Sequence, residues 1–238
     1  MPFDGGICDR YNDAMVTLLL CGRIRWITAA LVGWITLTGD ANLPAAEGNE
    51  KPEEPAFVFE TGSPPWTGER IVLPPDFARD LGWTGVEEIR FAPGMFEAGQ
   101  PDFFSYILVF LLEPGSDVSE EGLQRELLTY YAGLSKAVMA SRKLSVDTSG
   151  FTVSIQQDER ATDVPAAAPE ALLWKATLEW IEPFATRERQ SLHFELHTWE
   201  HEGQPVVLTL ASPVAPDSEE EDSPWAALRE IRASFRLE

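Results

Sequence analysis

The stretch from Phe103 to Leu112 constrains the fold most, because every residue in it except Ser105 is apolar. The run is too short to cross a bilayer as a helix, which takes about 20 apolar residues. It is rich in aromatic and β-branched side chains and ends at the turn pair Pro114-Gly115. Successive side chains of a strand point to opposite faces, so both faces of this strand would be apolar. We therefore predict a central strand covered on both sides, with a buried helix as the alternative.

Two amphipathic patterns further along the chain are predicted to supply the cover. The first has apolar residues at helical spacing from Leu123 to Val138 and continues to about Lys143, with Asp117 and Glu120 as a capping box. Gly133 lies inside it, where glycine costs about 1 kcal/mol relative to alanine, so we expect close packing at this position. The second helix is predicted to begin with Ser223 as N-cap and Pro224 at the first helical position, and its apolar face comprises Trp225, Leu228, Ile231 and Phe235.

Alternating apolar residues predict the remaining strands, at 69–73, 87–91, 151–155, 174–180, 192–196 and 206–210. The fold class that follows is α+β, with a mostly antiparallel sheet of about seven or eight strands covered by two main amphipathic helices. We expect residues 66–238 to form one domain of two similar halves, 66–158 and 171–238.

A weak internal similarity suggests that the halves arose by duplication of a β-β-α unit. Ile89-Arg90-Phe91 matches Leu178-Glu179-Trp180, and Tyr106, Leu108 and Gly115 match Phe194, Leu196 and Gly203 at a constant separation of 88 residues. Each match lies in a strand–loop–strand unit that an amphipathic helix follows.

The first 46 residues have the features of a secretory signal peptide. Arg23 and Arg25 precede the apolar run from Trp26 to Thr38, and small residues follow it. Met15 is an alternative start, and an uncleaved membrane anchor is the alternative interpretation of the apolar run. Both cysteines, Cys8 and Cys21, lie in this leader, so the exported part would have no disulfide and no thiol nucleophile. Residues 47–65, which are rich in proline and charge, are predicted to be a linker. We expect a secreted or periplasmic protein.

The acidic composition narrows the range of partners. The net charge is −21 at pH 7, with 18 Lys and Arg against 39 Asp and Glu. Nucleic acid and anionic membrane surfaces both attract clustered basic residues, so neither is expected as a partner. An unknown small ligand or another protein of the cell envelope remains the expected partner.

Three segments together resemble a family of uncharacterised secreted bacterial proteins. They are Glu87 to Gly94 (EEIRFAPG), Tyr106 to Glu113 (YILVFLLE) and Leu127 to Leu134 (LLTYYAGL). The resemblance covers roughly residues 66–158. It implies an exported protein, and it assigns no activity and no catalytic residue.

The histidines raise the question of a metal site. His197, Glu200 and His201 fit the H-x-x-E-H pattern of some zinc peptidases, and His193 lies four residues before His197. The neighbouring residues alternate as in a strand, where residues four apart are separated by roughly 13 Å. One zinc ion, with ligand bonds of about 2.0–2.3 Å, does not bridge that distance. We therefore expect no metal ion and no other cofactor, and we interpret the histidines as part of the polar, solvent-facing side of a strand.

Other candidates are less specific. The acidic run from Asp217 to Asp222 lacks the ligand spacing of a calcium loop and is interpreted as a solvated loop. Trp174, Trp180 and Trp225 are predicted to be core residues, whereas Trp66, Trp83 and Trp199 are candidates for stacking on a ligand or partner. The chain has no nucleophile-elbow, phosphate-loop or dinucleotide motif. The catalytic residues, if any, stay unknown at this point. The expected function is a non-catalytic binding module, and the alternative is a secreted hydrolase that uses paired carboxylates or the His/Glu zinc site.

Overall fold

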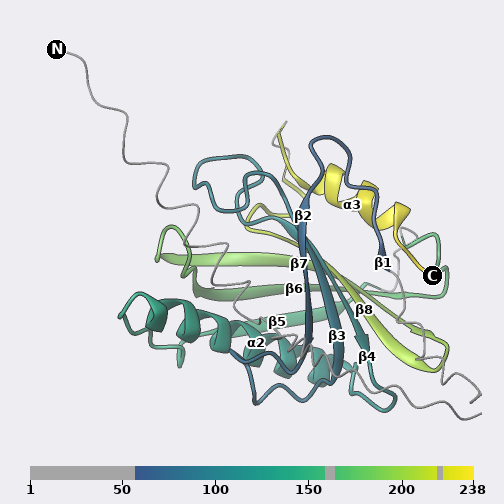
Figure 1. Cartoon of the computed structure of the whole chain (residues 1–238), viewed down its shortest axis with the longest axis horizontal. Helices are drawn as coiled ribbons and strands as arrows, with labels where there is room; N and C mark the ends of the chain where they lie inside the picture. Colours follow the sequence, from purple (N-terminus) through teal and green to yellow (C-terminus); the bar gives the residue numbers. More distant parts are fainter. Residues whose placement is uncertain (1–56, 159–163, 219–221) are drawn as a thin grey trace, which may run out of the picture. The chain divides into compact units, whose positions relative to one another are not determined.

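The computed structural model describes residues 57–158, 164–218 and 222–238 (Figure 1). The predicted signal peptide and residues 47–56 of the predicted linker lie outside the described residues, as do positions 219–221 of the acidic run. The described elements, in chain order, are β1 (Phe57–Val58), β2 (Thr67–Leu73), β3 (Gly85–Phe91), β4 (Tyr106–Leu112), α2 (Glu120–Ser141), β5 (Thr152–Gln157), β6 (Leu172–Ile181), β7 (Arg189–His201), β8 (Gln204–Ser212), α3 (Trp225–Ser234) and β9 (Arg236–Leu237).

A seven-stranded sheet in the order β2-β3-β4-β8-β7-β6-β5 forms the centre of this domain, and all of its strand pairs are antiparallel. A second, two-stranded sheet joins β1 to β9. The central strand that the apolar run predicts is β4, whose residues are all buried. The α+β prediction, with a sheet covered by helices, is confirmed.

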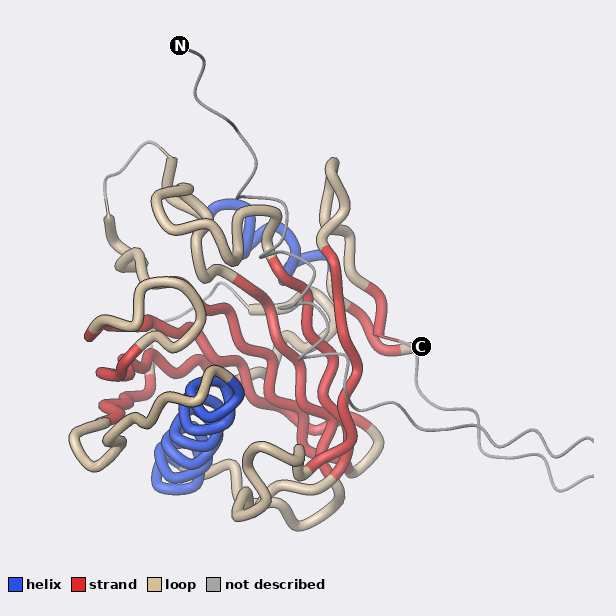
Figure 2. Tube along the Cα trace, turned by 60° about the vertical axis from the view of Figure 1, so that its left-hand side comes forward, coloured by secondary structure: helices blue, strands red, loops and turns tan. Residues whose placement is uncertain are grey.

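Helix α2 covers one face of the sheet, which we call the α2 face (Figure 2). The hydroxyls of Tyr106 on β4 and Tyr131 on α2 share a short hydrogen bond, and the ring of Tyr130 contacts the edge of Phe110. The predicted apolar stripe from Leu123 to Val138 is buried, as expected. A Cβ on Gly133 would lie 2.4 Å from the carbonyl oxygen of Phe77, so the close packing there is against the loop after β2 rather than the sheet.

Helix α3 covers the opposite face, the α3 face. The alternate residues of β4, Ile107, Val109 and Leu111, pack there in one core cluster. The other buried members of this cluster are Phe57, Ala168, Ala171, Trp199, Val206, Leu208, Leu210, Trp225, Leu228, Ile231 and Phe235. Burying apolar area contributes about 25 cal/mol per Å², which accounts for the apolar side chains on both sides of β4.

Both helices begin later than the sequence pattern predicts. The N-cap of α2 is Ser119, whose Oγ accepts a hydrogen bond from the Gly122 amide at 3.2 Å. Asp117 instead accepts bonds from the amide and hydroxyl of Ser119 and so fixes the cap itself. The N-cap of α3 is Pro224 and has no side-chain cap, so the prediction of Ser223 as N-cap was wrong.

The strand also begins later than predicted, at Tyr106 instead of Phe103. Phe104 has a φ of 49°, which breaks the extended backbone, and its amide donates to the Met95 carbonyl within the β3–β4 loop. The ring of Phe104 is buried against Trp180 and Phe184, at centroid distances of 5.3 and 5.6 Å. The first apolar residues of the run therefore join the β3–β4 loop to the end of β6.

The folded unit begins before the predicted boundary at residue 66. Phe57 on β1 is buried in the α3-face core, and the guanidinium of Arg70 lies 4.9 Å above its ring. The guanidinium of Arg90 lies 4.8 Å above the ring of Phe59 in the same way. The compact unit runs from Ala56 to Glu238, so the last part of the predicted linker is folded.

A hairpin joins β7 and β8, which contain the strands predicted at 192–196 and 206–210. Glu202 and Gly203 make its two-residue turn with φ values of 52° and 81°, the positive values that a type I′ turn requires. Two residues matched in the proposed duplication, Tyr106 and Phe194, lie on the strands that flank β8, and both pair with Ala211. The duplication itself stays a prediction.

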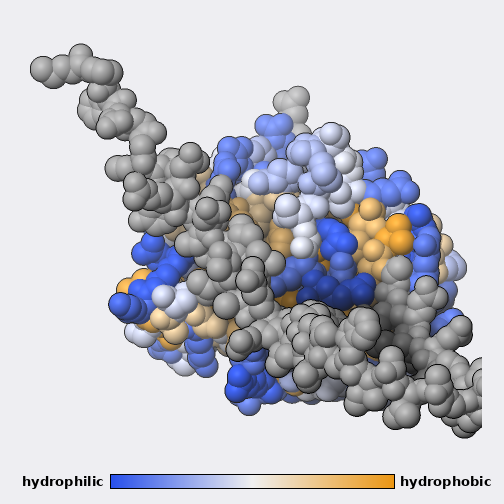
Figure 3. Space-filling model, viewed as in Figure 1, coloured by the Kyte–Doolittle hydropathy of each residue, from blue (hydrophilic) through white to orange (hydrophobic). Residues whose placement is uncertain are grey.

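In the part of the chain that the structure describes, no helix is both long enough and apolar enough to span a membrane. Figure 3 shows one side of the molecule, on which hydrophobic patches alternate with hydrophilic ones. The large hydrophobic residues that are most exposed in the described segments are Val72, Leu144 and Leu172.

Candidate functional site

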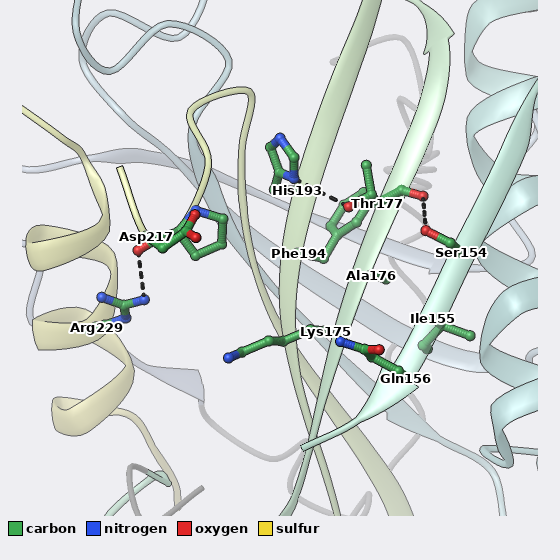
Figure 4. Close-up of a pocket in the computed structure, with 11 residues that line it drawn as sticks. Ser154, Ile155, Gln156, Lys175, Ala176, Thr177, His193, Phe194, Asp217 and Arg229 are labelled. Carbon is green, nitrogen blue, oxygen red and sulfur yellow. Dashed lines mark hydrogen bonds between the residues drawn. The ribbon is translucent and has the colours of Figure 1, made fainter. Parts of the chain in front are cut away.

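A cavity of about 490 Å³ opens on the α3 face of β5, β6 and β7 (Figure 4). Its volume lies within the range of about 300–1,000 Å³ that is typical of small-molecule sites. The side chains of its floor come from alternate positions of neighbouring strands and therefore point the same way. The lining residues are Ser154, Ile155, Gln156, Lys175, Ala176, Thr177, His193, Phe194, Pro216, Asp217 and Arg229.

The cavity floor consists of cross-strand rows of polar residues. Ser154 pairs with Thr177, which pairs with His193, so these three residues form one row. Thr177 Oγ1 and His193 Nδ1 share a hydrogen bond of 3.2 Å, and Ser154 Oγ donates to the Thr177 carbonyl at 3.5 Å. Gln156 and Lys175 form the next row, which Glu195 completes on β7.

Helix α3 and the loop before it form the cavity wall. Arg229 reaches from α3 to Glu195, with its Nε 3.2 Å from one carboxylate oxygen and its Nη2 2.5 Å from the other. The same Nη2 donates to the Pro216 carbonyl at 3.3 Å, which fixes the loop beside the cavity. The Arg229 guanidinium also lies over the aromatic ring of Trp225, 5.5 Å from its centroid. A charge-assisted bidentate pair of this kind holds the wall in one position.

Both of the cationic side chains that line the cavity, Lys175 and Arg229, are held in ion pairs. Lys175 pairs with Asp158 at 2.9 Å, and Arg229 pairs with Glu195. Burial lowers the pKa of His193, although the nearby Glu179 and Asp217 oppose the shift, so this imidazole is neutral at pH 7. The floor thus presents hydroxyl, amide and neutral imidazole groups between ion pairs. Such a surface suits a ligand that both donates and accepts hydrogen bonds and carries little charge.

The structure separates the three histidines. All lie on β7, as the alternation predicts, and His193 borders the cavity whereas His201 lies at the hairpin end. His197 is 0% exposed, so the prediction of a solvent-facing histidine row was wrong for this residue. The physical reason is that the middle of the α3 face is covered by the apolar core, where its neighbour Trp199 is also buried. Glu200 is exposed and points to the other face, because it lies between Trp199 and His201 and successive residues of a strand point to opposite faces.

Within the described ranges, no three His, Cys, Asp or Glu residues gather closely enough to hold a metal ion. His197, Glu200 and His201 therefore do not form such a group in the described structure. On a helix, residues four positions apart lie one turn apart on the same face. On the extended strand β7 the same four positions separate His197 from His201 along the sheet.

The tryptophans divide differently from the prediction. Trp174, Trp180 and Trp225 are buried, as expected. Trp83 and Trp199, which the sequence offers for stacking, are also buried, with 2% and 9% of their surface exposed. Trp83 packs on Phe110 and donates its Nε1–H to the Asp117 carbonyl at 3.0 Å. Of the three candidates only Trp66 keeps appreciable exposure.

Two carboxylates of the α2 face, Glu69 and Glu87, meet the description of a paired acid. They lie on neighbouring strands, since Glu69 pairs with Ile89 and Glu87 with Ile71. Burial raises the pKa of Glu69 to about 7 and that of Glu87 to about 8, and the Glu69 charge contributes to the second shift. Glu87 is 0% exposed, however, so it does not contact a substrate in this conformation.

Comparison with protein-family models, curated proteins and solved structures finds no match to this chain. The resemblance to secreted bacterial proteins therefore stays a prediction. What the fold and the cavity define is an α+β domain with a polar site on one face of its sheet.

Sequence reasoning missed most residues of this site. Of the lining residues, the sequence pattern pointed to His193 and Asp217, whereas Lys175, Thr177 and Arg229 were assigned to no site. The alternation does contain a signal, because Ser154, Gln156, Lys175, Thr177 and His193 are all polar at outward positions. The order of the strands in the sheet, which brings these positions side by side, is absent from the sequence pattern.

Proposed function

We propose that the chain is an exported, non-catalytic module that binds a small, neutral, hydrogen-bonding ligand such as a carbohydrate in the cavity over β5, β6 and β7. The observation that carries the proposal is the cavity floor, where polar groups from three strands face one opening beside the Arg229 wall. Export rests on the signal-like features of residues 1–46.

The same cavity offers little support for hydrolysis. A hydroxyl beside an imidazole, as in Thr177 and His193, is the start of a nucleophile–base pair. In hydrolases of this kind a third group, commonly a carboxylate, orients the base through its other nitrogen. Among the described residues, no carboxylate accepts a hydrogen bond from His193 Nε2. We therefore favour binding over catalysis, and binding of a small ligand over docking of an envelope protein.

Adjacent residues on opposite faces of β5 provide a matched test. Gln156 lines the cavity, whereas Gln157 points to the α2 face and is also exposed. Neutral mono- and disaccharides would be screened by saturation-transfer NMR against the purified protein, and a binder would then be titrated by calorimetry. Gln156→Ala and Thr177→Val should each weaken binding about fivefold, the cost of one net hydrogen bond of ~1 kcal/mol.

Gln157→Ala should leave the affinity unchanged. The proposal fails if none of the carbohydrates binds, or if Gln157→Ala weakens binding as much as Gln156→Ala does. Turnover of the bound carbohydrate, lost in His193→Ala, would support the hydrolase alternative instead.

A further inference from the structure

Glu87 is a fully buried acid that the proposed binding function does not use. It lies in the middle of β3 with 0% exposure. The hydroxyl of Tyr130 on α2 donates to its Oε1 at 2.8 Å. Its other oxygen, Oε2, is buried and has no hydrogen-bond partner among the described residues. An acid in this state avoids the cost of a buried charge by keeping its proton.

The surroundings of Glu87 supply no positive charge. The ionisable groups that face or flank it are Glu69 on β2, Tyr106 on β4, Arg125, Glu126, Tyr130 and Tyr131 on α2, and Asp76, Arg79 and Asp80 in the loop from Pro74 to Thr84. The other ionisable residues of α2, Glu120, Glu121 and Lys136, are exposed, and Arg70, Glu88 and Arg90 point to the α3 face. Arg79 pairs with Asp76 at the surface. Arg125 pairs with Glu126 and Asp117. The nearest carboxylate on the same face, Glu69, adds a like charge, so no ion pair compensates an ionised Glu87.

Tyr130 connects Glu87 to the elements that cover this face. Its ring contacts Phe77 of the Pro74–Thr84 loop at 5.0 Å and Phe110 of β4 at 6.0 Å, both edge-on. The loop also holds α2 directly, because the Gly82 amide donates to Glu126 Oε2 at 2.6 Å. The Tyr130 hydroxyl is therefore the single polar link between Glu87 and a unit made of α2 and this loop.

Burial raises the pKa of Glu87 to about 8. Burial also raises the pKa of Tyr130 well above its ordinary value, so its hydroxyl remains a donor throughout this range. When Glu87 ionises, Tyr130 satisfies one oxygen only, and the other needs water that the closed packing excludes.

We propose that Glu87 is a proton-operated latch. The closed packing under α2 accommodates Glu87 while it carries a proton, and when the proton leaves, the buried carboxylate needs water at its unsatisfied oxygen and opens this packing in spite of the bond from Tyr130. Opening lets water reach the carboxylate, and α2 with the Pro74–Thr84 loop is the part that moves. The sheet and α3 stay in place, because the buried acids of the other face, Glu88 and Glu195, are paired with arginines.

Opening of α2 would also affect β5 and β6, because α2 is hydrogen-bonded to both strands. Gln124 Nε2 donates to the Val153 carbonyl of β5 at 2.6 Å, and Ser135 Oγ donates to the Ile181 carbonyl of β6 at 3.2 Å. Both strands carry cavity residues on their opposite face. A loosened α2 would therefore remove support from the cavity floor.

Hydrogen–deuterium exchange of the full chain between pH 6 and 9 tests the latch. Rates are corrected for the intrinsic pH dependence of exchange, and peptides of α2 are compared with peptides of β7 and β8. In the wild type, protection of α2 should fall about tenfold relative to β7 and β8 as the pH rises, which corresponds to ~1.4 kcal/mol of local stability. Glu87→Gln, which keeps the size and the acceptor for Tyr130, should give the same α2 protection at every pH.

Glu97→Gln is the matched control, because Glu97 lies exposed in the β3–β4 loop and should keep the wild-type fall. A carbon-13 NMR titration of the glutamate carboxyls of the wild type provides a second measurement that needs no variant. The latch is overturned if the Glu87 signal titrates at an ordinary pKa, if α2 protection does not change with pH, or if Glu87→Gln follows the wild-type course.

Discussion

Glu87 and Glu88 are neighbours on β3 and point to opposite faces of the sheet. Glu88, on the α3 face, lies between two arginines, with 2.7 Å to Arg70 Nε and 2.7 Å to Arg90 Nη2. Glu87, on the α2 face, accepts one hydrogen bond, from the Tyr130 hydroxyl, and lies near a second acid, Glu69. Two identical side chains that are adjacent in the chain thus meet opposite electrostatic surroundings.

The difference shows that the two faces of one sheet treat a buried acid differently: one pairs it with cations and the other does not. At the edge strands of the α3 face, Arg70 and Arg90 both pair with Glu88 and stack on Phe57 and Phe59, which fastens the first residues of the domain. The α2 face gathers tyrosines around an uncompensated acid. The first face is therefore built for stability, and the second can respond to protons.

The largest effect is expected from truncating a buried leucine, and it shows whether both faces of the sheet are tightly packed. Leu108 faces α2 and Leu208 faces α3, and they are 1% and 0% exposed. Truncation of either one to alanine removes buried area and leaves a cavity, so each should lower the free energy of unfolding by about 2–5 kcal/mol. Urea unfolding measures both. A loss below about 1 kcal/mol at Leu108 alone would show that the α2 face is packed loosely even with its latch closed.

Replacement of Glu87 by glutamine should come next and should depend on pH. The pKa of Glu87 is about 8 in the folded protein and 4.5, the ordinary glutamate value, in the unfolded chain. The stability that the protonated acid contributes is therefore complete below pH 4.5 and is lost as the pH rises through 8. Glu87→Gln does not ionise, so at pH 8 it should be more stable than the wild type by about 1–3 kcal/mol, with no gain near pH 4.5. Unfolding curves across this range measure the difference. Equal pH dependence in both proteins would contradict the prediction.

Replacement of Glu88 by glutamine should have the opposite sign at neutral pH. The change removes the charge that both arginines face and should cost about 1–2 kcal/mol. The partners are partly exposed, so the loss should shrink in high salt. Urea midpoints at low and high salt measure it. A stabilising effect would mean that Arg70 and Arg90 do not depend on Glu88.

The smallest effect concerns the start of each covering helix. The Ser119 hydroxyl caps α2, whereas α3 has no side-chain cap. Ser119→Ala should therefore cost about 1 kcal/mol and Ser223→Ala no more than ~0.3 kcal/mol. Thermal unfolding of the two variants side by side measures the contrast. A larger loss at Ser223 would restore it as the cap of α3.

Much of the scaffold could be predicted from the sequence, because local periodicity encodes it. The apolar run that became β4, the stripe of α2 and the Glu202-Gly203 turn all rest on contacts between residues close in the chain. Helix starts were harder, since Asp117 and Ser119 both suit a cap and only the backbone of the turn chooses between them. The candidate site was mostly missed, because its residues belong to strands whose neighbours depend on the whole sheet order.

What the sequence by itself determined is therefore the class of fold and the alternation of each strand, because a side chain's polarity decides whether it can leave water. The tertiary structure decided which of the two adjacent acids is paired with arginines and which is buried without a cation. Nothing in the letters of Glu87-Glu88 separates them, yet β3 turns one toward two arginines and the other toward tyrosines. A residue's ionisation depends on the charges and dipoles within a few ångströms of it, and several of these, such as Arg70 beside Glu88 and Tyr130 beside Glu87, come from other segments of the chain.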